Sequence, residues 1–438
     1  MDTNHKNGIV AENTSNGQNA ARNVDGTRRV VITGMGAISP AGAGVGALWQ
    51  KVMAKECCIG ELTRFDTTDF SVKVAAQIPA YDPIELGLSK KETRRFARFV
   101  QYAMIAADEA IAQSGLDFSE EDTTRIGCSF GSGIGGLEDF EDGCRTLHSK
   151  GPRWVSPLLI PTMISNMAAG NLSIRYGLRG ECLNVVTACA TGTHSIGQAY
   201  RSIRHGYLDA ALAGGTEEAI TPIAVAGFGN LGALTKSADP LQASMPFDVR
   251  RSGFVAGEGA GALVLESLEH ALSRGANILG EVAGFGSTGD AYHMTSPEPT
   301  GEGVIRAMRQ ALDEAGMTPG DIGHLNAHGT STSANDKTES AALIGLCGEA
   351  GHDIPVVSVK GSTGHMLGAA GAIEAIVTVL SVVNACVPAT TGFSQPDPEC
   401  PVRVLTEPLE NYPQKVALSN SLGFGGHNAS LAVKAYEG

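Results

Sequence analysis

Short apolar runs, each leading into a glycine-rich turn and then a stretch with helical periodicity, recur along this chain. They predict strands near residues 29–36, 125–130, 183–187 and 210–213, and again near 278–284, 322–327 and 355–359. Helices are predicted over 92–115, 301–315 and about 366–384, and a last pair of strands flanks the tight loop at 422–426. Alternation of this kind predicts an α/β fold with largely parallel sheets.

The chain is long enough for two domain-sized halves, because it has 438 residues and single cores stop growing at about 250–300. A charged helix over 267–275 precedes the second set of strands. We therefore place the N-terminal half at 29–277 and the C-terminal half at 278–438. Residues 1–28 are polar and lack the apolar core of a signal peptide, so we expect a disordered N-terminal leader and a cytoplasmic protein.

Charge and apolar patterning exclude two classes of partner. The formal net charge is −14, whereas binding to nucleic acid needs a basic surface. No stretch reaches the roughly 18 apolar residues of a membrane span. We therefore expect neither nucleic acid binding nor a membrane span. The nine cysteines show no C-x-x-C spacing, which indicates free thiols in a reducing compartment and not a disulfide framework or a zinc site.

Cys189 has the most informative position of the nine cysteines. It follows the predicted strand at 183–187 and precedes a helical stretch whose first turns carry Gly192 and Gly197. A thiol at the start of a helix lies near unpaired backbone N–H groups and the positive end of the helix dipole, which favour the thiolate. Because the thiolate attacks acyl carbonyls, Cys189 is a candidate nucleophile. A buried structural cysteine is the alternative interpretation.

Two histidines follow predicted strands in the second half. His328 comes directly after one strand, and His365 lies at the start of the next helix, shortly after Lys360. A helix N-terminus disfavours the imidazolium, so we expect a neutral His365 that can donate a hydrogen bond to an oxyanion. Glu374, on the same helix, can hold Lys360. The alternatives are a histidine that caps a turn and an exposed lysine.

One nucleophilic cysteine and two histidines suit a carbon–carbon condensation. The cysteine carries an acyl group as a thioester. The two imidazoles bind a second thioester carbonyl, which becomes an enolate when carbon dioxide leaves. This chemistry needs neither a metal nor a redox cofactor, so we expect no cofactor and no metal site.

Four separate segments, in this order and spacing, resemble those of β-ketoacyl-acyl carrier protein synthases. They are TACATGTHS, NAHGTSTSANDKTE, VKGSTGHMLGAAGAIE and NSLGFGGHN, and the similarity runs from about Arg29 to Lys434. The elongating type II enzymes of fatty acid synthesis match best. The resemblance implies the thiolase fold, with five layers in αβαβα order and two similar halves, and a homodimer.

The resemblance also implies a reaction and its partners. An acyl chain is carried on Cys189 and condenses with malonyl-acyl carrier protein. The products are 3-oxoacyl-acyl carrier protein and carbon dioxide. The substrates are acyl and malonyl thioesters on the phosphopantetheine arm of acyl carrier protein, and no further cofactor takes part. A polyketide-type ketosynthase and a type I elongating synthase are the alternatives, which the sequence separates poorly, and the preferred chain length stays open.

The family's catalytic residues have counterparts in this chain. Cys189 matches the nucleophile, and His328 and His365 match the pair that binds the malonyl thioester. Lys360 matches a lysine that tunes the site. Backbone N–H groups of Cys189 and Phe424 are expected to form the oxyanion hole, and the Phe424 ring is expected to gate the acyl site. The acidic residues expected to support the site are Asp336, Glu339 and Glu374.

Substrate-binding positions follow from the same resemblance. Thr295, Thr330 and Thr332 match threonines that touch the phosphopantetheine arm. Ile134 and Leu159 occupy acyl-pocket positions, where large apolar side chains would limit chain length.

A basic stretch at residues 89–98 is unusual in so acidic a chain. It carries Lys91, Arg94 and Arg95. A charge run is most often a solvated helix face. The functional interpretation is a landing site for an acidic carrier protein, by charge complementarity. In the family this region meets the carrier, and Arg153 has the same implied role.

Three other interpretations are rejected. Residues 131–136 fit G-x-G-x-x-G after a strand, but a dinucleotide site wants an acid about 20 residues later, and residues 143–180 contain no Asp or Glu. We interpret this loop as close packing beside the acyl pocket. A thiolase lacks support because no second catalytic cysteine stands near the C-terminus. A non-catalytic partner subunit would have lost the active-site thiol.

Overall fold

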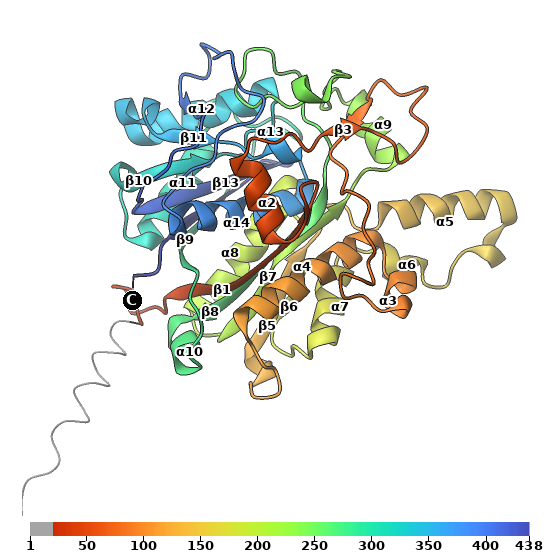
Figure 1. The fold of residues 1–438 in the computed structure, drawn as a ribbon, viewed down its shortest axis with the longest axis horizontal. Helices are drawn as coiled ribbons and strands as arrows, with labels where there is room; N and C mark the ends of the chain where they lie inside the picture. The colour runs from red at the N-terminus through yellow and green to blue at the C-terminus, as the bar shows by residue number, and fades with distance from the viewer. Residues whose placement is uncertain (1–20, 438) are drawn as a thin grey trace, which may run out of the picture.

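The computed structural model describes residues 21–437, and its strands form one continuous hydrogen-bonded series (Figure 1). Its order is β12-β11-β10-β13-β14-β9-β1-β8-β7-β5-β6, with β2 beside β1, and β3 and β4 pair separately. The strands are β1 (Val30–Ser39), β2 (Gly42–Ala43), β3 (Gly60–Glu61), β4 (Val74–Ala75), β5 (Ile126–Gly131), β6 (Cys182–Leu183), β7 (Ala210–Glu218), β8 (Glu258–Ser267), β9 (Gly280–Gly289), β10 (Ile322–Asn326), β11 (Pro355–Val357), β12 (Arg403–Val404), β13 (Val416–Gly423) and β14 (His427–Lys434).

The helices form three layers around the strands. α4 packs on β1, β8 and β7 at one outer face, α11 packs on β9 and β14 at the other, and α8 and α14 lie between the halves (Figure 1). The helices are α2 (Val45–Met53), α3 (Lys90–Arg95), α4 (Arg98–Ser114), α5 (Leu137–Lys150), α6 (Leu159–Met163), α7 (Met167–Tyr176), α8 (Thr191–Arg204), α9 (Pro222–Asn230), α10 (Leu268–Ser273), α11 (Glu302–Ala315), α12 (Ser333–Cys347), α13 (Lys360–Thr363) and α14 (Ala370–Val383). This confirms the predicted five-layered αβαβα arrangement of the thiolase fold.

The two halves repeat one strand order. The first places β1, β8, β7, β5 and β6 side by side, and the second places β9, β14, β13, β10 and β11 in the same succession. In each half the first three strands are antiparallel and the last three are parallel. The halves meet where β1 pairs antiparallel with β9, with Val30 opposite Val282. The predicted pair of similar halves is therefore present.

The prediction of largely parallel sheets is wrong, because each half is mixed. β8 and β14 run antiparallel to both of their neighbours. The connection between β13 and β14 consists of residues 424–426. So short a loop can join only antiparallel strands, whereas a parallel pair needs a long crossover. The tight glycine loop was visible in the sequence, and its consequence for strand direction was missed.

The helix predicted over 92–115 is divided in two. α3 begins with a capping box between Ser89 and Glu92. The chain then becomes extended at Phe96 and Ala97 before α4 starts. The backbone N–H of Phe99 donates to the buried Glu218 carboxylate at 2.8 Å, which fixes the start of α4 against β7. The break separates an exposed basic turn from the buried helix.

Part of the expected leader is folded. Ala21 is buried, the Arg28 guanidinium pairs with Asp209 at 2.7 Å, and Asp25 pairs with Arg204 at 2.7 Å. The expectation of a disordered leader over 1–28 is therefore wrong for residues 21–28, because these contacts tie the segment to α8 and β7. Residues 1–20 of the expected leader lie outside the described residues.

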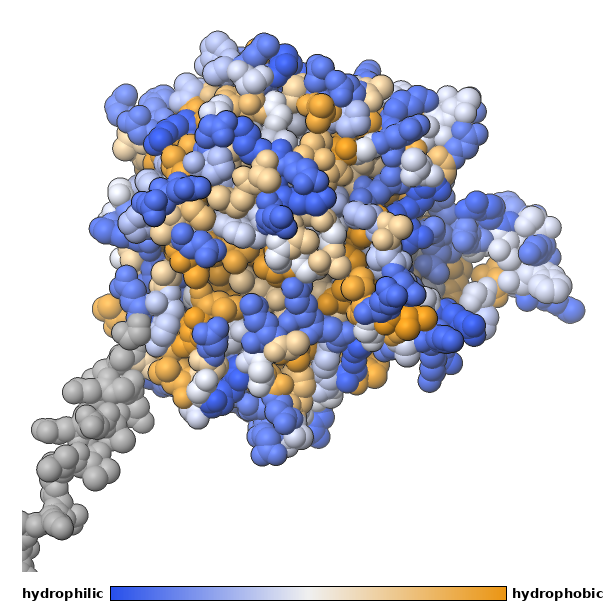
Figure 2. Space-filling view, in the orientation of Figure 1, coloured by the Kyte–Doolittle hydropathy of each residue, from blue (hydrophilic) through white to orange (hydrophobic). Residues whose placement is uncertain are grey.

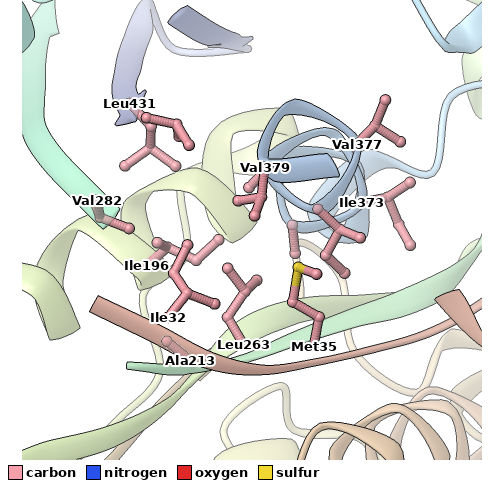
Figure 3. Packing of buried hydrophobic residues seen from close by; sticks show 14 of the residues in the cluster. Ile32, Met35, Ile196, Ala213, Leu263, Val282, Ile373, Val377, Val379 and Leu431 are labelled. Atoms are coloured by element: carbon pink, nitrogen blue, oxygen red, sulfur yellow. The ribbon is translucent and has the colours of Figure 1, made fainter. Parts of the chain in front are cut away.

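The main hydrophobic core lies between the sheets. Ile32 and Met35 of β1 and Leu263 of β8 face Ile373 and Val377 of α14 (Figure 3). α4 closes on the opposite side of β1, where a Cβ at Gly36 would lie 1.9 Å from the Ala106 carbonyl oxygen. No helix among residues 21–437 combines the length and apolar character that crossing a membrane requires. The apolar residues of α14 pack in the hydrophobic core between the sheets.

A histidine near the end of β8 makes stability dependent on pH. His270 lies between two carboxylates, with Nδ1 2.5 Å from Glu266 and Nε2 2.9 Å from Glu121. These contacts raise the pKa of His270 above its ordinary value of 6.5, chiefly through the hydrogen bond to Glu266. A raised pKa means that the charged form stabilises the folded state below about pH 6.5 and that this contribution disappears as pH rises through the folded pKa.

We expect His270→Gln to lose stability mainly at low pH. Urea unfolding of both proteins between mildly acidic and mildly alkaline pH should show a difference in unfolding free energy that is largest below about pH 6.5. That difference should shrink as pH rises. A difference that stays constant across this range would mean that the charge of His270 has no role.

Candidate active site

Cys189 lies in the turn between β6, the edge strand of the first half, and the helix α8. β6 ends at Leu183, a short 3-10 turn covers Ala188–Ala190, and α8 begins at Thr191. Ala188 has a φ of +50°, a left-handed conformation that costs energy in a residue with a Cβ. The predicted strand–turn–helix arrangement at the thiol is therefore present, and its backbone is strained beside the sulfur.

The expectation that this position favours the thiolate is wrong for the resting protein. Only 8% of Cys189 is exposed, and burial raises the pKa of its thiol to about 12. The positive charge of Lys360 lowers this pKa, while Glu217 and Glu374 raise it. Desolvation of the sulfur outweighs the start of the helix. The thiol is consequently neutral until a substrate changes its surroundings.

A buried carboxylate holds the His328 turn. Glu339 of α12 accepts hydrogen bonds from the backbone N–H groups of His328 and Gly329, both at 2.7 Å. Burial raises the pKa of Glu339 to about 7, and these two donors oppose the rise. Asp336, one turn earlier, accepts from the backbone N–H of Phe247 at 2.8 Å. Glu339 thus holds the His328 turn and Asp336 holds the backbone at Phe247. Neither carboxylate faces the pocket's interior as a ligand.

Lys360 fixes which nitrogen of His328 carries the proton. Its ammonium forms a buried ion pair with Glu374 and lies 3.3 Å from Nδ1 of His328. An ammonium can only donate, so Nδ1 accepts and the proton of the neutral ring sits on Nε2. Burial lowers the pKa of His328 well below its ordinary value, and Lys360 adds to this. His328 therefore presents an N–H donor.

His365 was predicted at the start of a helix, but it precedes the 3-10 turn Leu367–Ala369 that leads into α14. It forms an isolated bridge with Ala256, and its backbone N–H donates to Val255 at 2.7 Å. Its ring stands edge-on to His328 with centroids 5.1 Å apart. Burial, with help from Lys360, lowers the pKa of His365 well below its ordinary value. The expected neutral state is confirmed, but burial causes it.

The three groups meet around one pocket. The sulfur of Cys189 and one ring nitrogen each of His328 and His365 all lie within 4.8 Å of one another. Among the described residues, neither ring nitrogen of His365 has a hydrogen-bond partner. The pocket has a volume of about 230 Å³, and its lining also includes four of the other residues predicted for the site: Thr295, Thr330, Thr332 and Phe424.

Two predicted pocket residues lie elsewhere in this single chain. Ile134 and Leu159 are absent from the lining of the Cys189 pocket. Ile134 is 38% exposed, and Leu159 is half-buried against α5, close to Gly143. In the single chain, these two side chains therefore do not line the pocket that was predicted to bind the acyl group.

Two loops that cover the pocket are tied together. The backbone N–H of Gly425 donates to the Met294 carbonyl at 2.8 Å, and that of Asp290 donates to Gly426 at 2.9 Å. Asp290 also accepts from the Asn428 amide at 2.6 Å. Sequence reasoning missed Asp290 and Asn428 in the pocket lining. Their only signal was a position beside glycine loops, which does not show that the loops meet.

Glu217 was also missed. Its fully buried carboxylate accepts from the Ser132 hydroxyl at 2.8 Å and from the backbone N–H groups of Gly133, Ile134 and Gly368 at 2.9, 3.2 and 3.0 Å. It therefore occupies the N–H groups of the G-x-G-x-x-G loop that would otherwise face a phosphate. This is a physical reason for rejecting a dinucleotide site there.

The predicted carrier-binding residues are all on the surface. Lys91, Arg94 and Arg95 are exposed on α3, and Arg153 is exposed in a short turn before α6. Arg95 also borders a shallow groove that includes Leu158 of the α6 region. α3, which carries three of these cations, and α6 are neighbours in Figure 1.

Comparisons with known proteins agree with this arrangement. The profiles of the beta-ketoacyl synthase N-terminal and C-terminal domains match residues 27–271 and 279–394. The chain is 48% identical to a Staphylococcus aureus 3-oxoacyl-[acyl-carrier-protein] synthase 2 over 94% of its length and 99% of the relative. A beta-ketoacyl synthase from Burkholderia phymatum superposes with a TM-score of 0.86 at 34% identity, covering 93% of this chain and all of that one.

A further solved relative was determined together with a partner protein. It is a type II polyketide ketosynthase in complex with its acyl carrier protein. Its TM-score is 0.86 at 32% identity, and the alignment covers 94% of this chain and 100% of that chain.

Proposed function

Because the chain belongs to the beta-ketoacyl synthase family, we propose that it acts as a 3-oxoacyl-acyl carrier protein synthase of the elongating type II class. The observation that carries this proposal is the meeting of Cys189, His328 and His365 around one pocket. A buried thiol beside two neutral imidazoles suits acyl transfer followed by decarboxylative condensation. Nothing in this chemistry calls for a cofactor.

In the first half-reaction the acyl chain moves to Cys189. The sulfur attacks the carbonyl carbon of the acyl thioester, the bond to the carrier's sulfur breaks, and the thiol proton passes to that leaving sulfur. The imidazoles within 4.8 Å of the Cys189 sulfur are the groups that can relay the proton. Backbone N–H groups of Cys189 and Phe424 are assigned to the oxyanion.

In the second half-reaction the histidine pair stabilises an enolate. The malonyl thioester carbonyl accepts hydrogen bonds from the Nε2–H of His328 and from the ring of His365. Loss of carbon dioxide leaves the electron pair on this enolate. The enolate carbon attacks the acyl-Cys189 carbonyl, the Cys189 sulfur leaves and takes a proton, and the product is two carbons longer.

Threonines at the pocket mouth are assigned to the phosphopantetheine arm. Thr330 and Thr332 form a hydroxyl pair at 2.9 Å, and both line the pocket with Thr295. Hydroxyl groups can accept and donate, so they suit the amides of this arm.

A product assay tests the proposed function. The purified chain is mixed with malonyl-acyl carrier protein and carrier proteins that hold short, medium or long saturated chains, and 3-oxoacyl products are measured by mass spectrometry. We expect a two-carbon extension of fatty chains. Activity only with polyketide intermediates would instead support the polyketide-type alternative, and no extension of any chain would refute the proposal.

We assign carrier docking to the basic surface of α3. Reversing the charge of Arg94 and Arg95 should weaken carrier binding by about tenfold, because two exposed contacts together contribute about 1.4 kcal/mol. The salt dependence of binding should also become weaker. Titration of Arg94→Glu/Arg95→Glu with acyl carrier protein at two salt concentrations measures both effects. Arg309→Glu, an exposed change on α11, is the matched control. Equal losses in both variants would contradict docking at α3.

We also propose that two chains form the working homodimer. β6 is the free edge of the ladder, and apolar side chains around it are exposed, including Leu183 at 37% and Val186 at 48%. Ile134, which is 38% exposed, follows β5, the strand that pairs with β6. Figure 2 shows further hydrophobic surface at the base of the projecting α5. Such an edge suits pairing with a second copy. Sedimentation equilibrium would test this, and a monomer would contradict it.

We propose the cytoplasm as the site of action. All nine cysteines are free, which supports a reducing compartment.

A further inference from the structure

The same three groups that suit the condensation also form a set of metal ligands. Cys189 Sγ and one ring nitrogen each of His328 and His365 lie within 4.8 Å of one another, and no other group of three such residues was found among residues 21–437. All three side chains are buried, at 8%, 2% and 2% exposure. Both ring nitrogens of His365 lack a partner there. The ligand atoms therefore converge on one small volume.

We propose that this cluster binds one zinc ion reversibly and that bound zinc blocks Cys189. One thiolate and two imidazoles are the donor types that Zn²⁺ prefers, and three protein ligands leave a fourth position open to water from the pocket. Binding requires no redox change. The Cys189 S–H proton leaves for solvent as the sulfur–zinc bond forms.

The geometry needs only a small adjustment. Zinc–nitrogen bonds of about 2.0–2.1 Å and a zinc–sulfur bond of about 2.3 Å place tetrahedral ligand atoms about 3.3–3.6 Å apart. The observed limit of 4.8 Å means that the ligand atoms must approach by up to about 1.2–1.5 Å. Side-chain torsions can supply this without a change in the fold. The glycines and helices that position the three residues can stay in place.

Lys360 sets one cost of zinc binding, in addition to the release of the Cys189 proton. Its ammonium lies 3.3 Å from Nδ1 of His328, so the proton of His328 faces the cavity in the metal-free protein. Coordination through the cavity-facing nitrogen moves this proton to Nδ1 and breaks the contact with Lys360. The charge of Lys360 stays paired with Glu374. The cost at His328 is therefore one hydrogen bond and not an unpaired buried charge.

Titration of the full chain with Zn²⁺, followed by calorimetry, tests the proposal directly. We expect one ion per chain with wild type. Cys189→Ala should weaken binding by at least about 100-fold, because changes outside the ligand shell alone cost about 10- to 100-fold. Cys347→Ser, which alters a half-buried thiol at the end of α12, is the control and should bind as wild type does. Equal binding by Cys189→Ala would overturn the proposal.

A second readout keeps the test independent of mutant folding and of the condensing activity. Co²⁺ replaces Zn²⁺ in wild type, and a sulfur-to-cobalt charge-transfer band is expected. Prior alkylation of Cys189 with iodoacetamide should abolish this band, and Zn²⁺ should protect Cys189 from alkylation until a chelator is added. A missing band, or unchanged alkylation with zinc, would overturn the proposal even in a chain that condenses acyl thioesters.

Discussion

Replacing Cys189 by alanine is expected to lower the condensation rate by at least about 10⁴-fold. The reason is that Cys189 supplies the only thiol of the pocket, whose other polar side chains are imidazoles, hydroxyls, amides and the Asp290 carboxylate. The rate of 3-oxoacyl product formation measures the effect. Circular dichroism should show the same fold, since the loss of one sulfur next to Ala188 and Ala190 leaves a small gap. Full condensation by Cys189→Ala would refute the nucleophile.

A second substitution at the same residue separates the two half-reactions. Cys189→Gln cannot carry an acyl group, but His328 and His365 remain beside the pocket. We expect it to decarboxylate malonyl-acyl carrier protein while it fails to condense. Release of labelled carbon dioxide measures this activity. Loss of decarboxylation in a folded Cys189→Gln protein would show that the histidine pair does not act separately from the thiol.

Removing Lys360 is expected to have the largest effect on stability. Both members of its ion pair with Glu374 are only 1% exposed. Lys360→Ala leaves the carboxylate of Glu374 buried without a partner, and breaking a buried pair costs about 3–5 kcal/mol of unfolding free energy. Urea unfolding measures this loss. Lys360→Ala should also be inactive, because Nδ1 of His328 loses the donor that keeps its proton on Nε2.

The double variant Lys360→Met/Glu374→Leu distinguishes these two roles. Two apolar side chains of similar size leave no unpaired charge, so most of the stability should return. Activity should not return, because methionine cannot donate to His328. A double variant as active as wild type would contradict the assignment of the His328 proton by Lys360. A double variant as unstable as Lys360→Ala would contradict the electrostatic cause of the lost stability.

Local patterns predicted the parts of the site that depend on neighbours in sequence. Cys189 and His328 each follow a strand and precede small residues, and a strand followed by a glycine turn is a local signal. The same logic placed His365 at the start of a helix, whereas α14 begins only at Ala370. The chain makes an extra bridge to Ala256 before α14 begins, and this bridge depends on a segment more than a hundred residues away.

Long-range contacts explain what the sequence did not predict. Glu217 connects the Ser132 loop to Gly368 across the two halves, and nothing near Glu217 in the sequence indicates either partner. The raised pKa of Cys189 has the same origin, because burial comes from the assembled core and not from the helix start.

The most direct test of the central claim is the intact mass of the chain during a single turnover. The protein is first mixed with acyl carrier protein that holds an acyl chain, and then with malonyl-acyl carrier protein. The mass should rise by one acyl group, peptide mapping should place this group on Cys189, and it should disappear as 3-oxoacyl product forms. An acyl group on another residue, or product formed without any acyl adduct, would contradict condensation through Cys189.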